Sequence, residues 1–182
     1  MGGDFYDFYP LDNGRLGIFI AEGGNRGIGA ALSIALAKGF LMHTVRRNLS
    51  PREVLQRLES ALGPLLESAG GDAATHVAYA IIDAAGGTIR YARTGEYPRV
   101  VVSSALSAEQ KFEIPGTGTL LYEGSAHLRT GDTVLLFTDG IARRVRTTGP
   151  TAADGILKAL AKKRREHELE DDLTNSKTTS PP

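Results

Sequence analysis

Residues 2–32 read GGDFYDFYPLDNGRLGIFIAEGGNRGIGAAL, and this stretch decides the fold. An aromatic-rich segment leads into the turn sequence DNG at 12–14, which is followed by the apolar run LGIFI. Because Asn-Gly tolerates the positive φ angles of a type I′ turn, the pattern predicts an antiparallel hairpin. Folding back at this turn brings Glu22 to the level of Asp4. The two strands are expected at residues 5–11 and 16–20.

The predicted hairpin sets two carboxylates side by side at a glycine-rich strand end. Like charges at that distance are costly unless a proton or a cation neutralises them. The sequence therefore predicts a divalent-metal site that includes Asp4 and Glu22. The alternative is that these two residues and Asp7 are ordinary solvated charges.

The glycine-rich loop at residues 23–29 allows a second interpretation. Its sequence, GGNRGIG, is similar to the cofactor loop of the short-chain dehydrogenases, in which a helix N-terminus binds a pyrophosphate. A dinucleotide fold needs a parallel strand after that helix, whereas this sequence continues into a second helix. The dehydrogenases also pair a tyrosine with a lysine four residues on, and no tyrosine here has one. A Rossmann-type dinucleotide binder is the weaker alternative.

Length and composition indicate one ordinary globular domain. The chain has 182 residues, a formal net charge of zero, and no cysteine. Zero net charge gives no electrostatic argument for nucleic acid or a membrane surface as partner, and the lack of thiols agrees with a reducing compartment. No run approaches the roughly 18 apolar residues of a membrane span, and no signal peptide is visible. We therefore expect a cytoplasmic protein.

Two helices are predicted after the hairpin. The first covers residues 27–45, and the second begins at a capping box formed by Ser50 and Glu53. Gly63-Pro64 is expected to bend or end the second helix. The inward face of the first helix is predicted from three- and four-residue spacing at Ile28, Leu32, Ala35, Leu36, Gly39 and Phe40.

The second half of the chain has the pattern of a strand-rich layer. Paired strands, then two helices, then a run of antiparallel strands favour an α+β sandwich. A polar tail at 175–182 is predicted to be disordered. Strands are expected at 76–83, 88–92, 99–103, 120–122, 126–129 and 133–137, and a last helix at 152–168.

Four acidic residues stand at the ends of predicted strands or after a strand: Asp4, Glu22, Asp139 and Asp171. Carboxylates are hard oxygen ligands, which suit Mg²⁺ or Mn²⁺ rather than zinc. The four histidines are scattered without ligand spacing, and we interpret them as structural or surface residues.

Short motifs accompany these acids over residues 2–174. They are Gly2-Gly3-Asp4-Phe5-Tyr6-Asp7, Ile20-Ala21-Glu22 with Gly27 and Ala30-Ala31, Ser50-Pro51, Thr94-Gly95 with Pro98, Gly131-Asp132, Phe137-Thr138-Asp139-Gly140 and Asp171-Asp172-Leu173-Thr174. In this order they resemble the PPM-type metal-dependent serine/threonine protein phosphatases, in the bacterial SpoIIE/RsbU-like branch.

The resemblance implies an α/β (α+β) fold, a β-sandwich flanked by helices, as one domain at residues 2–174. It also implies two Mn²⁺ or Mg²⁺ ions at one edge of the sandwich. Glu22 would take the place of the aspartate that bridges both ions, and Gly23 would contribute its backbone carbonyl. Asp4 would serve one ion, and Asp139 and Asp171 the other. A water activated by both ions would attack the phosphoryl group in line.

The implied substrate is a small regulatory protein that carries phosphoserine or phosphothreonine, in bacterial signalling. An attached sensor domain or a second copy of the chain is a further implied partner. Neither nucleic acid nor a membrane is expected as a partner.

Several positions depart from the family pattern. The bridging aspartate is replaced by Glu22, and the interval between Asp139 and Asp171 is shorter than the family commonly uses. The strand before the hairpin and an apolar closing strand are also absent from the sequence, which leaves sheet edges open. These departures predict either a weak phosphatase or a degenerate, non-catalytic binding module that keeps the phosphatase fold.

Overall fold

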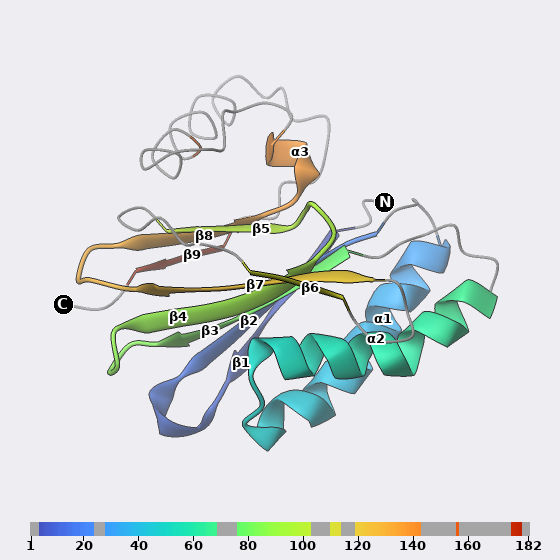
Figure 1. Ribbon diagram of the computed structural model, residues 1–182, viewed down its shortest axis with the longest axis horizontal. Helices are drawn as coiled ribbons and strands as arrows, with labels where there is room; N and C mark the ends of the chain where they lie inside the picture. Colours follow the sequence, from blue (N-terminus) through green and yellow to red (C-terminus); the bar gives the residue numbers. More distant parts are fainter. Residues whose placement is uncertain are drawn as a thin grey trace.

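Two antiparallel sheets lie face to face in the computed structural model, with two long helices against the outer face of the larger sheet (Figure 1). The structure describes residues 4–23, 28–68, 76–102, 110–113, 119–142, 156 and 176–179. Within these residues, the larger sheet has the order β1-β2-β3-β4-β7-β6 and the smaller one β5-β8-β9. The arrangement is a mixed α+β sandwich flanked by helices, as expected.

The element bounds are as follows. The larger sheet contains β1 (Asp4–Pro10), β2 (Leu16–Glu22), β3 (His76–Asp83), β4 (Thr88–Thr94), β6 (Gln110–Glu113) and β7 (Leu120–His127). The smaller sheet contains β5 (Arg99–Val102), β8 (Thr133–Phe137) and β9 (Ser176–Thr179). The helices are α1 (Ile28–Thr44), α2 (Pro51–Ser68) and α3 (Asp139–Ala142), with short 3-10 turns at Asp12–Gly14 and Val45–Arg47.

The N-terminal hairpin is formed as the sequence predicted. Asn13 has φ 60° and Gly14 has φ 70°, the positive values that a tight turn of this hand requires. Strand β1 pairs with β2 in antiparallel register, and Asp4 lies directly opposite Glu22. Strand β2 is also antiparallel to β3. The Rossmann alternative is therefore wrong, because that fold requires parallel neighbours.

Helix α2 begins at the predicted capping box. The Ser50 amide donates to Glu53 Oε2 at 2.8 Å, and the Glu53 amide donates to Ser50 Oγ at 3.3 Å. Gly63-Pro64, expected to bend or end this helix, does not end it, since α2 continues through Pro64 to Ser68. Among the described residues, no helix is long and apolar enough to cross a membrane.

The predicted inward face of α1 is wrong. Leu32 is 56% exposed and Leu36 is 43% exposed, whereas Ser33, Ala37 and Leu41 are buried. The helix carries apolar residues on all of its sides. Two different rows of its side chains therefore have the three- and four-residue spacing of an inward face. The row with the smaller side chains faces the sheet, because it lets the helix approach more closely.

Three differences concern the strands. The two strands expected at 120–122 and 126–129 are one continuous strand, β7, and β6 was not predicted. Residues 176–179, expected to lie in a disordered tail, form β9 and pair with β8. The polar composition of this segment does not prevent pairing, because an edge strand needs only its backbone groups. Apart from Ile156, the last helix predicted at 152–168 lies outside the described residues.

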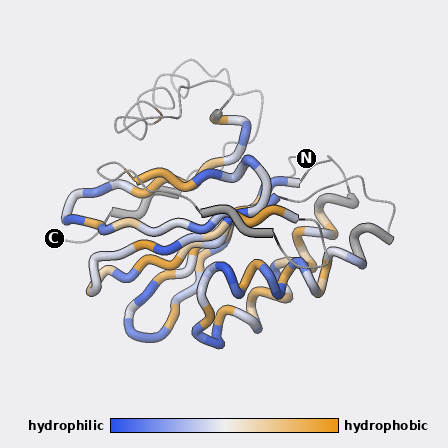
Figure 2. The backbone as a smooth tube through the Cα atoms, viewed as in Figure 1, coloured by the Kyte–Doolittle hydropathy of each residue, from blue (hydrophilic) through white to orange (hydrophobic). Residues whose placement is uncertain are grey.

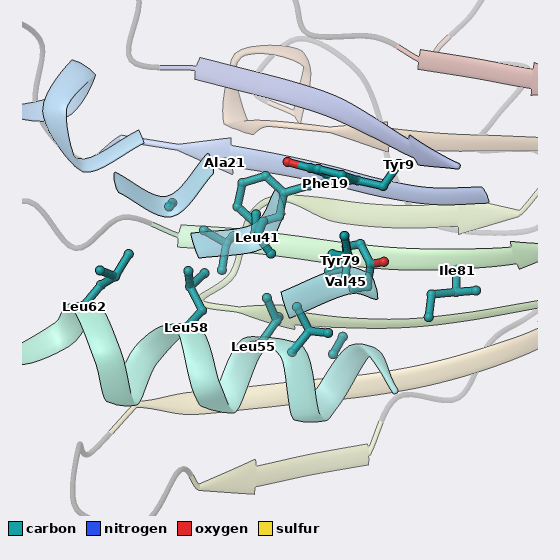
Figure 3. Close-up of a cluster of buried hydrophobic side chains, with 14 of the residues drawn as sticks. Tyr9, Phe19, Ala21, Leu41, Val45, Leu55, Leu58, Leu62, Tyr79 and Ile81 are labelled. Carbon is teal, nitrogen blue, oxygen red and sulfur yellow. The ribbon is translucent and has the colours of Figure 1, made fainter. Parts of the chain in front are cut away.

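Hydrophobic side chains fill both faces of the larger sheet, and apolar positions recur along its central strands (Figure 2). Between the sheet and the helices, Phe19 and Tyr79 pack with Leu41 and Leu55 (Figure 3). Between the two sheets the core is formed by Ile18, Ile20, Ala78, Ala80, Ile82, Ile89, Tyr91, Val100, Val102, Val134 and Leu136. A third cluster on the outer face of the smaller sheet contains Leu135, Phe137, Ile141 and Ile156.

Gly124 provides a test of the inter-sheet core. A Cβ at this position would overlap the ring of Tyr91, a fully buried residue directly opposite on β4. We expect Gly124→Ala to lower the free energy of unfolding by about 1–3 kcal/mol, because a packed core accommodates added volume poorly. The measurement is chemical denaturation.

The control is Gly39→Ala on the exposed side of α1, where nothing lies within 4 Å of the added methyl group. This change should raise stability by about 0.5–1 kcal/mol, since alanine favours a helix interior over glycine. Equal effects at the two sites would contradict the close approach of Gly124 and Tyr91.

Candidate metal centre

The hairpin positions the first two acidic side chains. Asp4 is the first residue of β1 and Glu22 the last of β2, and they are paired across the two strands. Directly opposite residues of an antiparallel pair point to the same face of the sheet. Both side chains are half-buried. Gly23 follows Glu22 directly, so its backbone carbonyl lies at the same strand end.

The third acid comes from the smaller sheet. Strand β8 ends at Phe137, and the next two residues reach the hairpin. Thr138 Oγ1 donates to Asp4 Oδ2 at 2.7 Å, and the Asp139 amide donates to Glu22 Oε2 at 3.3 Å. The structure therefore brings together three of the four predicted acids, at the point where the two sheets meet.

Burial and the neighbouring acids together raise the pKa of Glu22 to about 8. Burial is the largest cause, followed by a side-chain hydrogen bond with Asp139 and by the charges of Asp139 and Asp4. Each of these effects disfavours the ionised carboxylate, and only the hydrogen bond from the Asp139 amide opposes them. A cation bound among the three carboxylates would favour the ionised form instead.

The sequence also singled out Asp171 and Asp7. Asp171 is outside the described residues. Asp7 points toward α1, where its Oδ2 lies 3.2 Å from Lys38 Nζ, and it takes no part in the acidic cluster. In the described part of the chain, no three histidine, aspartate or glutamate side chains form a group that could hold a metal ion. The cluster of Asp4, Glu22 and Asp139 is thus not a complete ligand set by itself.

The chemistry of the cluster nevertheless fits a hard divalent cation. It offers carboxylate oxygens from three chain segments and a backbone carbonyl, which are the donors that Mg²⁺ and Mn²⁺ prefer. Burial, and then the nearby acids, disfavour the ionised form of Glu22 and so raise its pKa. A divalent cation bound there would favour the ionised carboxylate of Glu22.

A buried arginine orders the loop after β4, close to the cluster. Arg93 is 4% exposed, and its Nη1 donates to the carbonyl oxygens of Gly95 and Glu96. Gly95 has φ 69°, and a side chain there would overlap the ring of His76, the residue opposite Glu22 on β3.

Sequence reasoning missed Thr138 and Arg93. Thr138 belongs to a recognised motif, but only its neighbour Asp139 was selected as a ligand. A signal was present, because Thr138 is the polar residue that follows the apolar run VLLF at 134–137. Arg93 gave no signal, since an arginine in a strand is normally solvent-exposed.

Most of this chain matches one known protein family. The model of the family "Stage II sporulation protein E (SpoIIE)" matches residues 12–178. The chain belongs to the SpoIIE family. A comparison with curated proteins finds no significant match.

Solved structures show the same fold at low sequence identity. The RsbU and RsbW domains of a Mycobacterium tuberculosis protein align with a TM-score of 0.69 and 22% identity, covering 100% of this chain and 58% of that one. This chain thus spans little more than half of that relative. The phosphatase domain of SpoIIE from Bacillus subtilis aligns with a TM-score of 0.58 and 17% identity, covering 100% and 88%. RsbX in complex with magnesium aligns with a TM-score of 0.64 and 17% identity, covering 96% and 85%. The fold is that of the PPM phosphatases.

The raised pKa of Glu22 predicts a pH dependence for the metal-free SpoIIE-family chain. With its pKa raised to about 8, Glu22 keeps its proton in the folded protein up to about that pH, whereas the unfolded chain releases it near the ordinary glutamate pKa of 4.5. Because the folded state binds more protons between these values, its stability falls as pH rises through this window. Chemical denaturation in a chelator, from pH 5 to 8.5, measures the effect.

Glu22→Gln is the matched variant, because the amide keeps the shape of the side chain and cannot ionise. Relative to this variant, the wild-type chain should lose stability steadily as pH rises across the window. Saturating Mg²⁺ or Mn²⁺ should reduce the difference, since a cation favours the ionised carboxylate. Parallel stability curves for the two proteins in chelator would show that Glu22 titrates normally.

Proposed function

We propose that this chain is a Mn²⁺- or Mg²⁺-dependent phosphoprotein phosphatase that acts on phosphoserine or phosphothreonine. The observation that carries the proposal is the convergence of Asp4, Glu22 and Asp139 at the junction of the two sheets. Membership in the SpoIIE family and the phosphatase fold support the same activity.

The side chains of the cluster would hold the cations. Asp4, Glu22 and Asp139, with Asp171 and the Gly23 carbonyl, are the proposed ligands, and two ions are expected. When bound, the cations supply a water of lowered pKa as nucleophile and neutralise charge on the phosphoryl oxygens. The magnesium complex of RsbX supports the choice of a hard divalent ion.

Neighbouring residues hold the carboxylates of the cluster in position. Thr138 and the Asp139 amide fix the carboxylates of Asp4 and Glu22 by hydrogen bonds. Arg93 holds the loop after β4, in which Gly95 lies close to the ring of His76, the residue paired with Glu22. A phosphorylated side chain would thus meet carboxylates held in a fixed arrangement, which is the main requirement for an in-line displacement.

The proposed substrate is a small phosphorylated regulatory protein in bacterial signalling, and the proposed location is the cytoplasm. A sensor domain or a second copy of the chain is the proposed regulatory partner. The exposed apolar side of α1 supports such a partner, because Leu32, Leu36 and Met42 are each more than 40% exposed. Strand β9 already occupies one of the two sheet positions that were expected to be open.

A non-catalytic binding module is the second candidate, and Glu22 is the observation that favours it. The aspartate that the family has at this position is one methylene shorter than Glu22. The longer side chain would hold two bound ions at a different distance from each other. Here the longer carboxylate is also held by the Asp139 amide. We therefore expect weak rather than high activity.

A phosphoserine peptide tests the proposed activity directly. Turnover should require Mn²⁺ or Mg²⁺, stop in chelator, and fall by at least about 100-fold in Asp139→Asn, since removing a charged group from such a site typically costs several kcal/mol. Glu22→Asp should turn over faster than wild type, because it restores the family's bridging length.

The outcomes separate the two candidates. Turnover in wild type supports the phosphatase, and turnover only in Glu22→Asp identifies a degenerate enzyme. If neither protein shows metal-dependent turnover while both remain folded, the binding module is the better account.

A further inference from the structure

Thr138 is held rigidly at the junction between β8 and α3. Its side chain is fully buried at 0% exposure, although threonine is usually a surface residue. Its backbone carbonyl accepts the Ile141 amide at 3.3 Å, which closes the first turn of α3. On the other side it follows β8, whose residues pair with both β5 and β9. The position of the Thr138 side chain is therefore set by secondary structure on both sides.

The hydroxyl group of Thr138 bonds to a distant carboxylate. A buried threonine in or near a helix usually bonds to a backbone group of its own segment. Thr138 instead donates to Asp4 Oδ2 at 2.7 Å, across the gap between the two sheets. A hydrogen bond to an ionised carboxylate is shorter and stronger than one between neutral groups. Because a β-branched side chain has few rotamers, this donor is fixed in direction.

The next residue holds the other member of the hairpin pair. The Asp139 amide donates to Glu22 Oε2 at 3.3 Å. Two consecutive residues that follow β8 thus donate hydrogen bonds to the two paired carboxylates of the larger sheet. Because Thr138 and Asp139 are joined by one peptide bond, the distance between their two donor groups limits how far apart the Asp4 and Glu22 carboxylates can lie.

We propose that Thr138 is a positioning residue that sets the affinity of the acidic cluster for divalent cations through Asp4. The inference deepens the proposed function and rests on cation binding at this cluster. Without the hydroxyl group, Asp4 would lose a short hydrogen bond that helps to orient its carboxylate, and the cation would have to order this side chain further on binding. Groups that orient a ligand in this manner typically change metal affinity by about 10–100-fold when removed.

Three variants test the inference by metal titration calorimetry with Mn²⁺ alone. Thr138→Val removes the hydroxyl group and keeps the shape, and it should weaken Mn²⁺ binding about 10–100-fold. Thr138→Ser keeps the hydroxyl group and should bind within about threefold of wild type, because its donor remains in place. Thermal unfolding in chelator establishes that each variant is folded at the titration temperature.

Thr94→Val is the matched control. Thr94 is also a buried threonine at a strand end, and its Oγ1 accepts a hydrogen bond from the Val77 amide at 3.0 Å. Loss of that bond affects stability without touching Asp4. Thr94→Val should therefore leave Mn²⁺ affinity unchanged even where its melting temperature falls as much as that of Thr138→Val.

The results distinguish the inference from the proposed function. Equal Mn²⁺ affinity in wild type and Thr138→Val, or equal losses in Thr138→Val and Thr94→Val, would overturn the role of Thr138. Absence of Mn²⁺ binding in wild type would overturn both proposals. Binding with the predicted order of affinities but no phosphatase turnover would overturn the phosphatase and support the positioning role.

Discussion

The register between β1 and β2 is the constraint on which the rest of the structure depends. A slip by one residue would move every side chain of a strand to the opposite face. The same register that sets Asp4 opposite Glu22 also directs Phe19 into the helix-side core and Ile20 into the inter-sheet core. Burial of these apolar side chains on both faces, together with the turn at residues 12–14, therefore fixes the two carboxylates in place. The position of the acidic pair is a consequence of hydrophobic packing.

Local signals in the sequence were sufficient for the hairpin and for the start of α2. The turn at Asn13-Gly14 and the reciprocal hydrogen bonds of Ser50 and Glu53 each involve residues close together in the chain. Their geometry therefore follows from the local sequence. The orientation of α1 was different, because apolar residues on all sides leave the choice of face to the shape of the sheet below. The pairing of residues 176–179 likewise depends on an open edge of β8, which their own polar composition does not reveal.

The candidate site was predictable only as a set of residue types. Carboxylates at strand ends pointed to Asp4, Glu22 and Asp139, and the structure places these three together. The bonds that organise them join residues 134 and 117 positions apart, from Thr138 to Asp4 and from Asp139 to Glu22. No periodicity or spacing contains that information, since it arises from the stacking of two sheets. This is why a ligand was recognised while the residue that orients a ligand was missed.

The electrostatics of the cluster connect its stability with its proposed activity. Burial, together with the two neighbouring acids, raises the pKa of Glu22 and makes its ionisation unfavourable in the metal-free protein. The cores on both faces of the larger sheet compensate for this cost, as expected when a functional arrangement is held by the surrounding fold. A cation that binds only the folded arrangement would remove the repulsion and stabilise the protein by mass action. If the proposed cation binds, relief of this unfavourable ionisation would contribute to its affinity, and the hydrogen bonds from the β8–α3 junction would hold the carboxylates of Asp4 and Glu22 in place for it.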